Sequence, residues 1–297
     1  MADIGTNVKS VKIEEYAATI IKKKDQPKFN FNNDLVENFL TKLLEKTDGQ
    51  NDVDSHIVKF FRPSVFQNMS LHYCSILYEG SKKDPFEFMN FCKQFLTKES
   101  IRSCMIETLE QSGNKIWFEL RYGRITASKL YEASNCTTFN GSLVESLLGL
   151  VKINAQAVER GKNLEQAVLS EVQKMFKTQI KKCGLILSEE YPIFGASPDG
   201  ITNDAVYEVK CPFNEKNIKN YYDGGKINNK VRAQLQLQMF LAKKNIGYLC
   251  IASPNFEKDK KVTTIKDEFS SKFLSAIIKK AINFWINGIF PNLMNSM

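Results

Sequence analysis

The sequence predicts an α/β protein in which a mixed central sheet is flanked by helices, with a further helical region at the N-terminus. Helical spacing of apolar residues dominates the first third of the chain, from about residue 33 to residue 112. Short apolar segments bounded by Gly, Pro, Asn or Asp then follow between residues 182 and 209. Beyond them the pattern runs helix, strand, strand, helix, which is typical of a layered α/β domain.

The N-terminal region is expected to be helical because Leu35, Val36, Phe39, Leu43 and Leu44 recur at helix spacing. Residues 86–91 and 101–109 show the same pattern. No catalytic constellation is visible here. We therefore predict a helical region of unknown role over residues 1–110, followed by a main domain over residues 111–297.

Within the main domain each element is predicted from its own pattern. A helix–turn–helix is expected over 117–133, with a turn at Gly123 and a second helix beginning at Thr126 or Ser128, both good N-caps. Further helices are expected at 142–151, 155–177, 233–241 and 269–289, the last ending at Gly288 and Pro291. Strands are expected at 182–187, 193–196, 205–209, 247–252 and 261–265.

The composition favours a polyanionic partner. The net charge is +8 and the isoelectric point is near 9, and lysines or arginines beside phosphates release condensed counterions. A merely basic soluble protein remains an alternative. No apolar segment resembles a secretory signal or a membrane span, so we expect a soluble intracellular protein without a membrane partner. A nuclear or virus-associated compartment is not readable from the sequence.

Cysteine and histidine usage narrows the chemistry. The seven cysteines are odd in number and contain no CxxC pair, which argues against a disulfide framework and a structural zinc site. The two histidines, His56 and His72, both lie in the first third of the chain. A metal site in the remainder would therefore need oxygen ligands.

One constellation of such ligands follows the short strands. Asp199 lies in a Pro198-Asp199-Gly turn, and Glu208 and Lys210 lie on the next strand. Residues two apart on a strand face the same side, so Glu208 and Lys210 should face one site, with the carbonyl of Val209 as a further oxygen ligand. Carboxylates with a lysine can hold Mg²⁺ and activate a water for phosphodiester hydrolysis. The bare pattern is common, and an exposed hairpin with solvated charges is the alternative. Charges that interrupt an otherwise apolar strand favour the functional interpretation.

Several separated motifs resemble the YqaJ-type viral recombinase family of lambda-exonuclease-like PD-(D/E)XK nucleases. In chain order they are Trp117-Phe-Glu-Leu-Arg-Tyr-Gly-Arg-Ile-Thr-Ala-Ser128, Gly161-Lys-Asn-Leu-Glu165, Ala196-Ser-Pro-Asp-Gly200, Glu208-Val-Lys-Cys-Pro212 and Ala233-Gln-Leu-Gln-Leu-Gln-Met239. The resemblance covers roughly residues 107–293. It implies a restriction-endonuclease-like PD-(D/E)XK core.

The resemblance also implies roles for the matching residues. Asp199 and Glu208 would ligate Mg²⁺, or Mn²⁺ as a substitute, with Glu165 completing the acidic set directly or through water. Lys210 would position or deprotonate the attacking water, and Gln234 would support the site. These five residues are the expected catalytic set.

Arg121 and Ser128 would bind the phosphate at a 5′ end, as the matching residues of the family do. An arginine fork with a hydroxyl at a helix N-terminus is a sound anion site on physical grounds. The alternatives are a surface salt bridge for Arg121 and a plain N-cap for Ser128. Residues 221–226 are predicted to form a flexible loop, either over the DNA or simply at the surface with partly buried tyrosines.

The implied activity is a Mg²⁺-dependent exonuclease that acts from a 5′ end of double-stranded DNA in viral-type recombination or DNA processing. A structure-specific or nonspecific endonuclease and a catalytically silent DNA-binding module are the alternatives. A single-strand annealing protein is an expected partner of the first. Whether the chain forms a homo-oligomer, like the ring-shaped trimer of the phage enzyme, is left open by the sequence.

Overall fold

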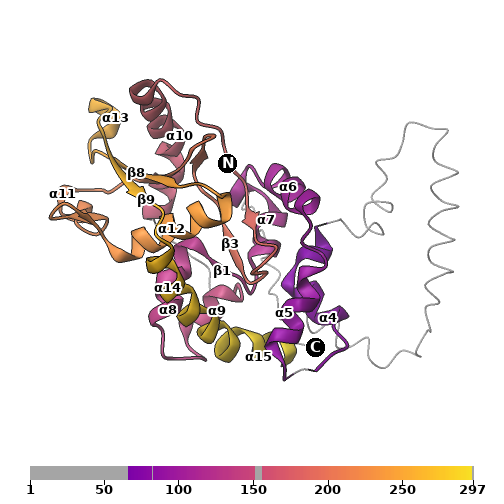
Figure 1. Cartoon of the computed structure of the whole chain (residues 1–297). Coiled ribbons are helices and arrows are strands. Elements are labelled where there is room, and N and C mark those ends of the chain that lie inside the picture. Colours follow the sequence, from indigo (N-terminus) through magenta and orange to yellow (C-terminus); the bar gives the residue numbers. More distant parts are fainter. Residues whose placement is uncertain (1–65, 82, 151–155, 296–297) are drawn as a thin grey trace, which may run out of the picture. The chain divides into compact units, whose positions relative to one another are not determined.

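The computed structural model describes residues 66–81, 83–150 and 156–295, which belong to one compact unit, Pro63–Met297 (Figure 1). The predicted helical segment at residues 35–44 lies outside the described residues. Helices at the start of the unit share its core. Helix α4 (Leu71–Leu77) packs against the C-terminal helix α15 (Phe290–Asn295), and α6 (Lys98–Glu107) packs against strand β2 (Ile186–Leu187). The boundary proposed between residues 110 and 111 remains a prediction.

The first half of the unit is mainly helical. Asp84 and Thr97 cap the two helices predicted from residues 86–91 and 101–109, because their side chains accept backbone N–H groups of the first turn. Both helices are confirmed. The elements are η2 (Gln67–Met69), α4 (Leu71–Leu77), α5 (Pro85–Lys93), α6 (Lys98–Glu107), η3 (Gln111–Gly113), α7 (Lys115–Arg121), β1 (Ile125–Thr126), η4 (Ala127–Lys129), α8 (Leu130–Asn135), α9 (Ser142–Leu147) and α10 (Gln156–Phe176).

The second half carries most of the strands. Its elements are β2 (Ile186–Leu187), β3 (Phe194–Ala196), β4 (Gly200–Ile201), β5 (Ala205–Lys210), α11 (Glu215–Ile218), β6 (Tyr222–Asp223), β7 (Lys226–Ile227), α12 (Asn229–Ala242), β8 (Ile246–Ala252), α13 (Phe256–Asp259), β9 (Val262–Glu268), α14 (Ser271–Phe284), η5 (Trp285–Ile289) and α15 (Phe290–Asn295). The α/β fold class is therefore confirmed.

The largest sheet has the order β4-β5-β8-β9 and is mixed. Strands β5 and β8 are parallel, whereas β4 and β9 run antiparallel to their neighbours. Helix α12 connects the parallel pair, as a parallel connection requires. A smaller sheet has the order β1-β3-β2. Asp199 lies between β3 and β4, so the turn that carries it joins the two sheets.

Alternation along β5 places helices on both faces of the larger sheet. Val206 packs in a cluster with Leu235 and Met239 of α12, whereas Tyr207 and Val209 pack with residues of α10. Successive side chains of a strand point to opposite faces. Helices α10 and α12 therefore sandwich the strand that carries Glu208 and Lys210 (Figure 1).

Three sequence-based details are wrong. Neither Thr126 nor Ser128 caps a helix, because the chain first forms β1, pairs with β3 and enters η4, which has no side-chain cap. Strand 182–187 is reduced to Ile186–Leu187. The predicted flexible loop at 221–226 is a small hairpin of β6 and β7, in which Gly224 and Gly225 adopt positive φ angles of 54° and 80°.

The C-terminal helix also differs from the prediction. Instead of ending at Gly288 and Pro291, α14 passes into the π-helical turn η5 and then α15. Trp285 in this turn is fully buried and donates its indole N–H to the Gly123 carbonyl at 2.8 Å. A buried indole needs such a partner, which ties the end of the chain to the turn after α7.

All seven cysteines are free thiols, in agreement with the expected lack of a disulfide framework. Among the residues that the structure describes, no helix combines the length and the apolar character needed to cross a bilayer.

Candidate active site

The site begins where β4 stops covering β5. Strand β4 pairs only with Val206 and Tyr207, and Asp199 precedes it. The backbone N–H of Asp199 donates to the Tyr207 carbonyl at 3.1 Å, and its Oδ2 accepts the N–H of Val209 at 2.7 Å. The Asp199 side chain thus takes the place of a neighbouring strand. Because N–H and C=O of one strand residue point to the same side, the Val209 carbonyl also faces the Asp199 edge.

Glu208 and Lys210 lie on the same face of β5, as their spacing predicts. Lys210 Nζ donates to Glu208 Oε1 at 2.6 Å, while Val209 packs on the other face among apolar residues. Glu208 is only 4% exposed. Burial acts to lower the pKa of Lys210, but the charges of Glu208 and Asp199 outweigh it and the pKa is raised. Lys210 is therefore an ammonium group in this arrangement.

Helix α12 supplies two amides to Glu208. Gln234 Nε2 donates to Oε1 at 2.7 Å, and Gln238 Nε2 donates to Oε2 at 2.6 Å. Lys210 also donates to Gln234 Oε1 at 3.3 Å. Gln234 was predicted at this site and Gln238 was not. The missed signal is the spacing of four residues, which places both amides on one face of a helix.

Glu165 extends the acidic group from α10. Burial and the neighbouring charge of Glu208 raise the pKa of Glu165 to about 7, against the weaker opposing effect of Lys182 and Lys210. Burial and the charges of Glu208 and Glu165 likewise raise the pKa of Asp199 well above its usual value. The carboxylates of Glu165, Asp199 and Glu208 therefore lie near one another, although they come from three different segments of the chain.

Glu165 and Asp199 both line a cavity of about 200 Å³, together with Gln111, Lys162, Gln166 and Lys182. Gln111 has a left-handed backbone with φ of 42°. Its side-chain amide donates to the carbonyls of Cys183 at 3.0 Å and Pro198 at 3.3 Å. Gln111 therefore fastens the turn that carries Asp199. No local pattern marks it, because its partners are 72 and 87 residues away.

Carboxylate oxygens and a backbone carbonyl suit a hard divalent cation. Among the described residues, however, no three Asp, Glu, His or Cys side chains are grouped closely enough to hold a metal ion. The reason is visible in the contacts of Glu208, whose two oxygens accept Lys210, Gln234 and Gln238. The carboxylate oxygens and the backbone carbonyl are suitable ligands for such an ion. Binding would require the carboxylate side chains to move closer to one another.

Arg121 lies at the end of α7, with its guanidinium 3.7 Å from the centroid of the Trp117 ring. The Trp117 indole in turn donates to Ser197 Oγ at 3.0 Å, in the segment that leads to Asp199. Burial lowers the pKa of Arg121 to about 10, so the group stays charged at neutral pH. No ion pair joins Arg121 to another residue within the described part of the chain.

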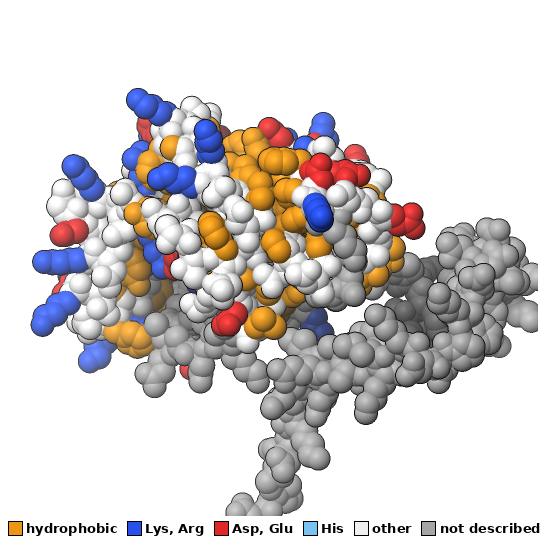
Figure 2. All heavy atoms as spheres, turned by 90° about the horizontal axis from the view of Figure 1, so that it is seen from below, with side chains coloured by type: hydrophobic (Ala, Val, Ile, Leu, Met, Phe, Trp, Pro, Cys, Tyr) orange, Lys and Arg blue, Asp and Glu red, His pale blue; other side chains and the backbone are white. Residues whose placement is uncertain are grey.

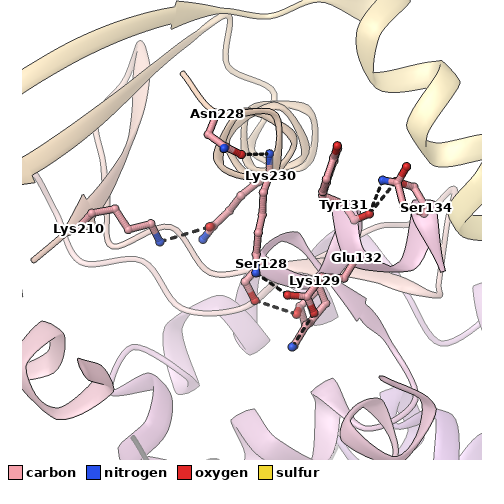
Figure 3. A network of polar contacts seen from close by, with 11 residues as sticks. Ser128, Lys129, Tyr131, Glu132, Ser134, Lys210, Asn228 and Lys230 are labelled. Carbon is pink, nitrogen blue, oxygen red and sulfur yellow. Dashed lines mark hydrogen bonds and ion pairs between the residues drawn. The ribbon is translucent and has the colours of Figure 1, made fainter. Parts of the chain in front are cut away.

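Ser128 is exposed in η4, and its Oγ lies 3.3 Å from Thr126 Oγ1. Glu132 next to it accepts Lys129 at 2.7 Å and also bonds Lys230 at the start of α12 (Figure 3). Contacts between η4 and α12 hold Ser128 beside the helix that carries Gln234. Among the described residues, no hydrogen bond joins Ser128 and Arg121, so their joint role remains a prediction.

Comparison with known proteins shows which family this part of the chain is similar to. Residues 116–245 match the YqaJ-like viral recombinase domain. No curated protein sequence matches the chain. Among solved structures, LHK-Exo in complex with dAMP is similar with a TM-score of 0.50 and 23% identity, over 58% of this chain and 90% of the other.

Two further solved structures are more distant in shape. The alkaline exonuclease of Laribacter hongkongensis has a TM-score of 0.49 and 25% identity, over 58% of this chain and 90% of that one. The shutoff and exonuclease protein of Kaposi's sarcoma-associated herpesvirus has a TM-score of 0.47 and 14% identity, over 96% of this chain and 90% of that one.

The family match includes Arg121, Ser128, Glu165, Asp199, Glu208, Lys210 and Gln234, and it leaves out Gln111. The order of the motifs and the mixed sheet agree with this assignment. Residues 116–245 are therefore similar to the YqaJ-like viral recombinase domain, and the fold resembles that of LHK-Exo.

Proposed function

We propose that the protein is a Mg²⁺-dependent deoxyribonuclease that hydrolyses phosphodiester bonds from a 5′ end of double-stranded DNA. The observation that carries the proposal is the convergence of Asp199, Glu208 and Lys210 at the uncovered edge of β5, with Glu165 facing them. A buried carboxylate cluster with one lysine matches the needs of metal-assisted hydrolysis. A role confined to stability does not account for carboxylates whose charges repel one another.

The metal would be held by the carboxylates of Asp199 and Glu208 and by the carbonyl of Val209, with Glu165 completing the set. When bound, Mg²⁺ or Mn²⁺ stabilises negative charge on the phosphate oxygens and lowers the pKa of a ligated water. Binding requires ionised carboxylates. The raised pKa values of Glu165 and Asp199 therefore make the ionised set more readily available at mildly alkaline pH.

Lys210 is proposed to orient the attacking water. Its raised pKa favours the protonated form, which can donate hydrogen bonds but cannot accept a proton. Gln234 forms hydrogen bonds with both Lys210 and Glu208. It therefore fixes the distance between the ammonium group of Lys210 and the carboxylate of Glu208. Catalytic groups must be held closely for the reacting atoms to align.

Preference for a 5′ end is proposed to come from Arg121 and Ser128. A charged guanidinium stacked on Trp117 and without a carboxylate partner among the described residues is available to a terminal phosphate. The product of such an enzyme is single-stranded DNA, which a single-strand annealing protein would bind. An endonuclease of the same chemistry would not depend on a terminal phosphate, and a silent DNA-binding module would not cut.

Incubation of the full chain with Mg²⁺ and an end-labelled linear duplex, beside a closed circular duplex, tests the proposal. Degradation of the linear DNA alone, faster with a 5′ phosphate than with a 5′ hydroxyl, is the expected result. Nicking of the circle would favour the endonuclease. Absence of cleavage with binding retained would overturn the enzymatic proposal.

A further inference from the structure

A second cavity is lined by residues that neighbour Glu165 and Lys210 in the chain. It has a volume of about 330 Å³ and is lined by Glu159, Arg160, Asn163, Leu164, Phe213 and Glu257. Pockets for small ligands are usually about 300–1,000 Å³ in volume. Leu164 precedes Glu165 on α10, and Phe213 follows Lys210 by three residues. The cavity is thus attached to the catalytic elements at two points.

The lining combines a ring with a planar cation. Phe213 is 50% exposed, although it stands directly after the buried pair Cys211 and Pro212. The guanidinium of Arg160 lies 5.5 Å from the centroid of its ring. An exposed ring next to a catalytic strand loses apolar contacts unless a ligand covers it.

Arg160 is built into the cavity rather than lying on the surface. Its side chain is 14% exposed, it forms an ion pair with Glu257 of α13, and its Nη2 donates to the Pro254 carbonyl at 3.1 Å. Its Nε is buried and has no hydrogen-bond partner among the described residues. A buried donor without a partner is costly, so this group indicates a missing acceptor.

The charges around the cavity exclude a phosphate as its ligand. Glu257 neutralises Arg160, and Glu159 adds a further negative charge at the lining. A phosphate would be repelled, whereas a neutral nucleobase can stack on Phe213 and present donors and acceptors to the carboxylates and to the Asn163 amide.

Positive charges around the cavity can attract the phosphate backbone of a DNA strand. Exposed lysines lie on and beside α11 and α13, namely Lys216, Lys219, Lys258, Lys260 and Lys261. Figure 2 shows Lys and Arg side chains that project from the left side of the molecule, which is the side of α11 in Figure 1. Lysines outside a neutral pocket would contact the backbone while a base enters the pocket.

We propose that this cavity binds one nucleobase of the DNA strand that is cut, stacked on Phe213 and read by Asn163, next to the scissile phosphate. The proposal rests on the proposed function, because it takes DNA as the substrate. It adds a base-binding site beside the metal-binding edge.

An abasic scan tests the proposal with the full chain and Mg²⁺. Oligonucleotide duplexes carry a single abasic residue at successive positions near the scissile phosphate. In the wild type, one position should raise KM about tenfold, the effect of losing one base–aromatic stack. For Phe213→Ala, the KM of every duplex should be about as high as the KM of the wild type for the duplex with the critical abasic position. The KM of this variant should not depend on where the abasic residue lies. Phe213→Trp should restore both the low KM for intact duplex and the dependence of KM on the abasic position.

Phe86→Ala is the matched control, because Phe86 is a similarly exposed ring on α5. It should behave like the wild type. Equal responses of the wild type and Phe213→Ala to every abasic position would overturn the base site and leave the proposed nuclease intact. Failure of the wild type to cut or bind any duplex would overturn both.

Discussion

The edge of β5 and the region around Arg121 are organised in different ways. At the edge, Glu208, Lys210 and Gln234 are joined by hydrogen bonds of 2.6–3.3 Å, and Asp199 is held beside them by the backbone N–H of Val209. Among the described residues, no hydrogen bond joins Arg121 and Ser128; Arg121 stacks on Trp117, and Ser128 lies beside Thr126. The first region is preorganised, whereas the second would be assembled by a ligand that bridges the two residues.

This contrast follows from where the residues lie in the chain. Asp199, Glu208 and Lys210 fall within twelve residues. Glu208 and Lys210 lie on β5, and Asp199 directly precedes β4, whose pairing with β5 fixes the distances among them. Arg121 and Ser128 lie on α7 and η4, on either side of the short strand β1. The hydrogen-bond register of two paired strands fixes the relative positions of their side chains. The connection between α7 and η4 imposes no such constraint on Arg121 and Ser128.

The largest expected effect comes from the preorganised edge. Asp199→Ala removes a carboxylate and the acceptor of the Val209 N–H, so cleavage of linear duplex should fall to background. A gel assay with end-labelled DNA measures this, and circular dichroism checks that the fold is kept. Full activity in a folded variant would show that the site lies elsewhere.

Gln238 provides a sharper test of the same edge, because α12 also carries a matched control. Gln238→Leu removes the donor to Glu208 Oε2 and should lower kcat about 10–100-fold, the value of a hydrogen bond to a charged group. Gln236 is equally buried, but it bonds Asp267, the Glu268 carbonyl and Ser270 instead.

Gln236→Leu should therefore lower the melting temperature without a comparable loss of kcat at temperatures where the protein is folded. If both variants lose kcat in proportion to their loss of stability, Gln238 acts only through the fold.

Arg121 tests the second region. Arg121→Ala should reduce the preference for 5′-phosphorylated over 5′-hydroxyl ends roughly tenfold, since a charge-assisted hydrogen bond is lost. Arg102→Ala, on the exposed face of α6, serves as the control and should keep the preference. An unchanged ratio in Arg121→Ala would remove Arg121 from the recognition of the end.

The pH dependence of stability gives the smallest effect. The pKa of Glu165 is raised to about 7 in the folded chain, so the unfolded chain loses this proton at lower pH than the folded one. The metal-free protein should therefore become less stable from about pH 5 to pH 8. Thermal unfolding should show a melting temperature that falls by a few degrees, with a shallower slope in Glu165→Gln. If the melting temperatures of the wild type and Glu165→Gln fell equally with pH, the raised pKa of Glu165 would not be the cause.

The sequence was most informative where local spacing determines geometry. The facing of Glu208 and Lys210 follows from strand alternation, and the structure confirms it with a 2.6 Å contact. The helix of Gln234 was also predicted, although Gln238 one turn later was overlooked. The catalytic roles of these residues remain predictions.

Contacts between distant parts of the chain could not be predicted. Gln111 was assigned no role, yet its amide reaches two carbonyls that lie more than 70 residues away. Arg124 is fully buried and donates to the carbonyls of Leu120, Met69 and Pro192. Neither residue carries a local pattern, because its partners are brought to it by the tertiary fold. The continuation of α14 through a π-helical turn is of the same kind, since the buried indole of Trp285 anchors it.

Calorimetric titration of Mn²⁺ into the full chain at mildly alkaline pH tests the central claim, that the carboxylates at the edge of β5 form a metal site, without relying on activity. The wild type should bind Mn²⁺ with a measurable heat and release fewer protons as the pH rises above the pKa of Glu165. Asp199→Asn should lose this binding, whereas Arg121→Ala should keep it. Undiminished Mn²⁺ binding by folded Asp199→Asn would contradict the account.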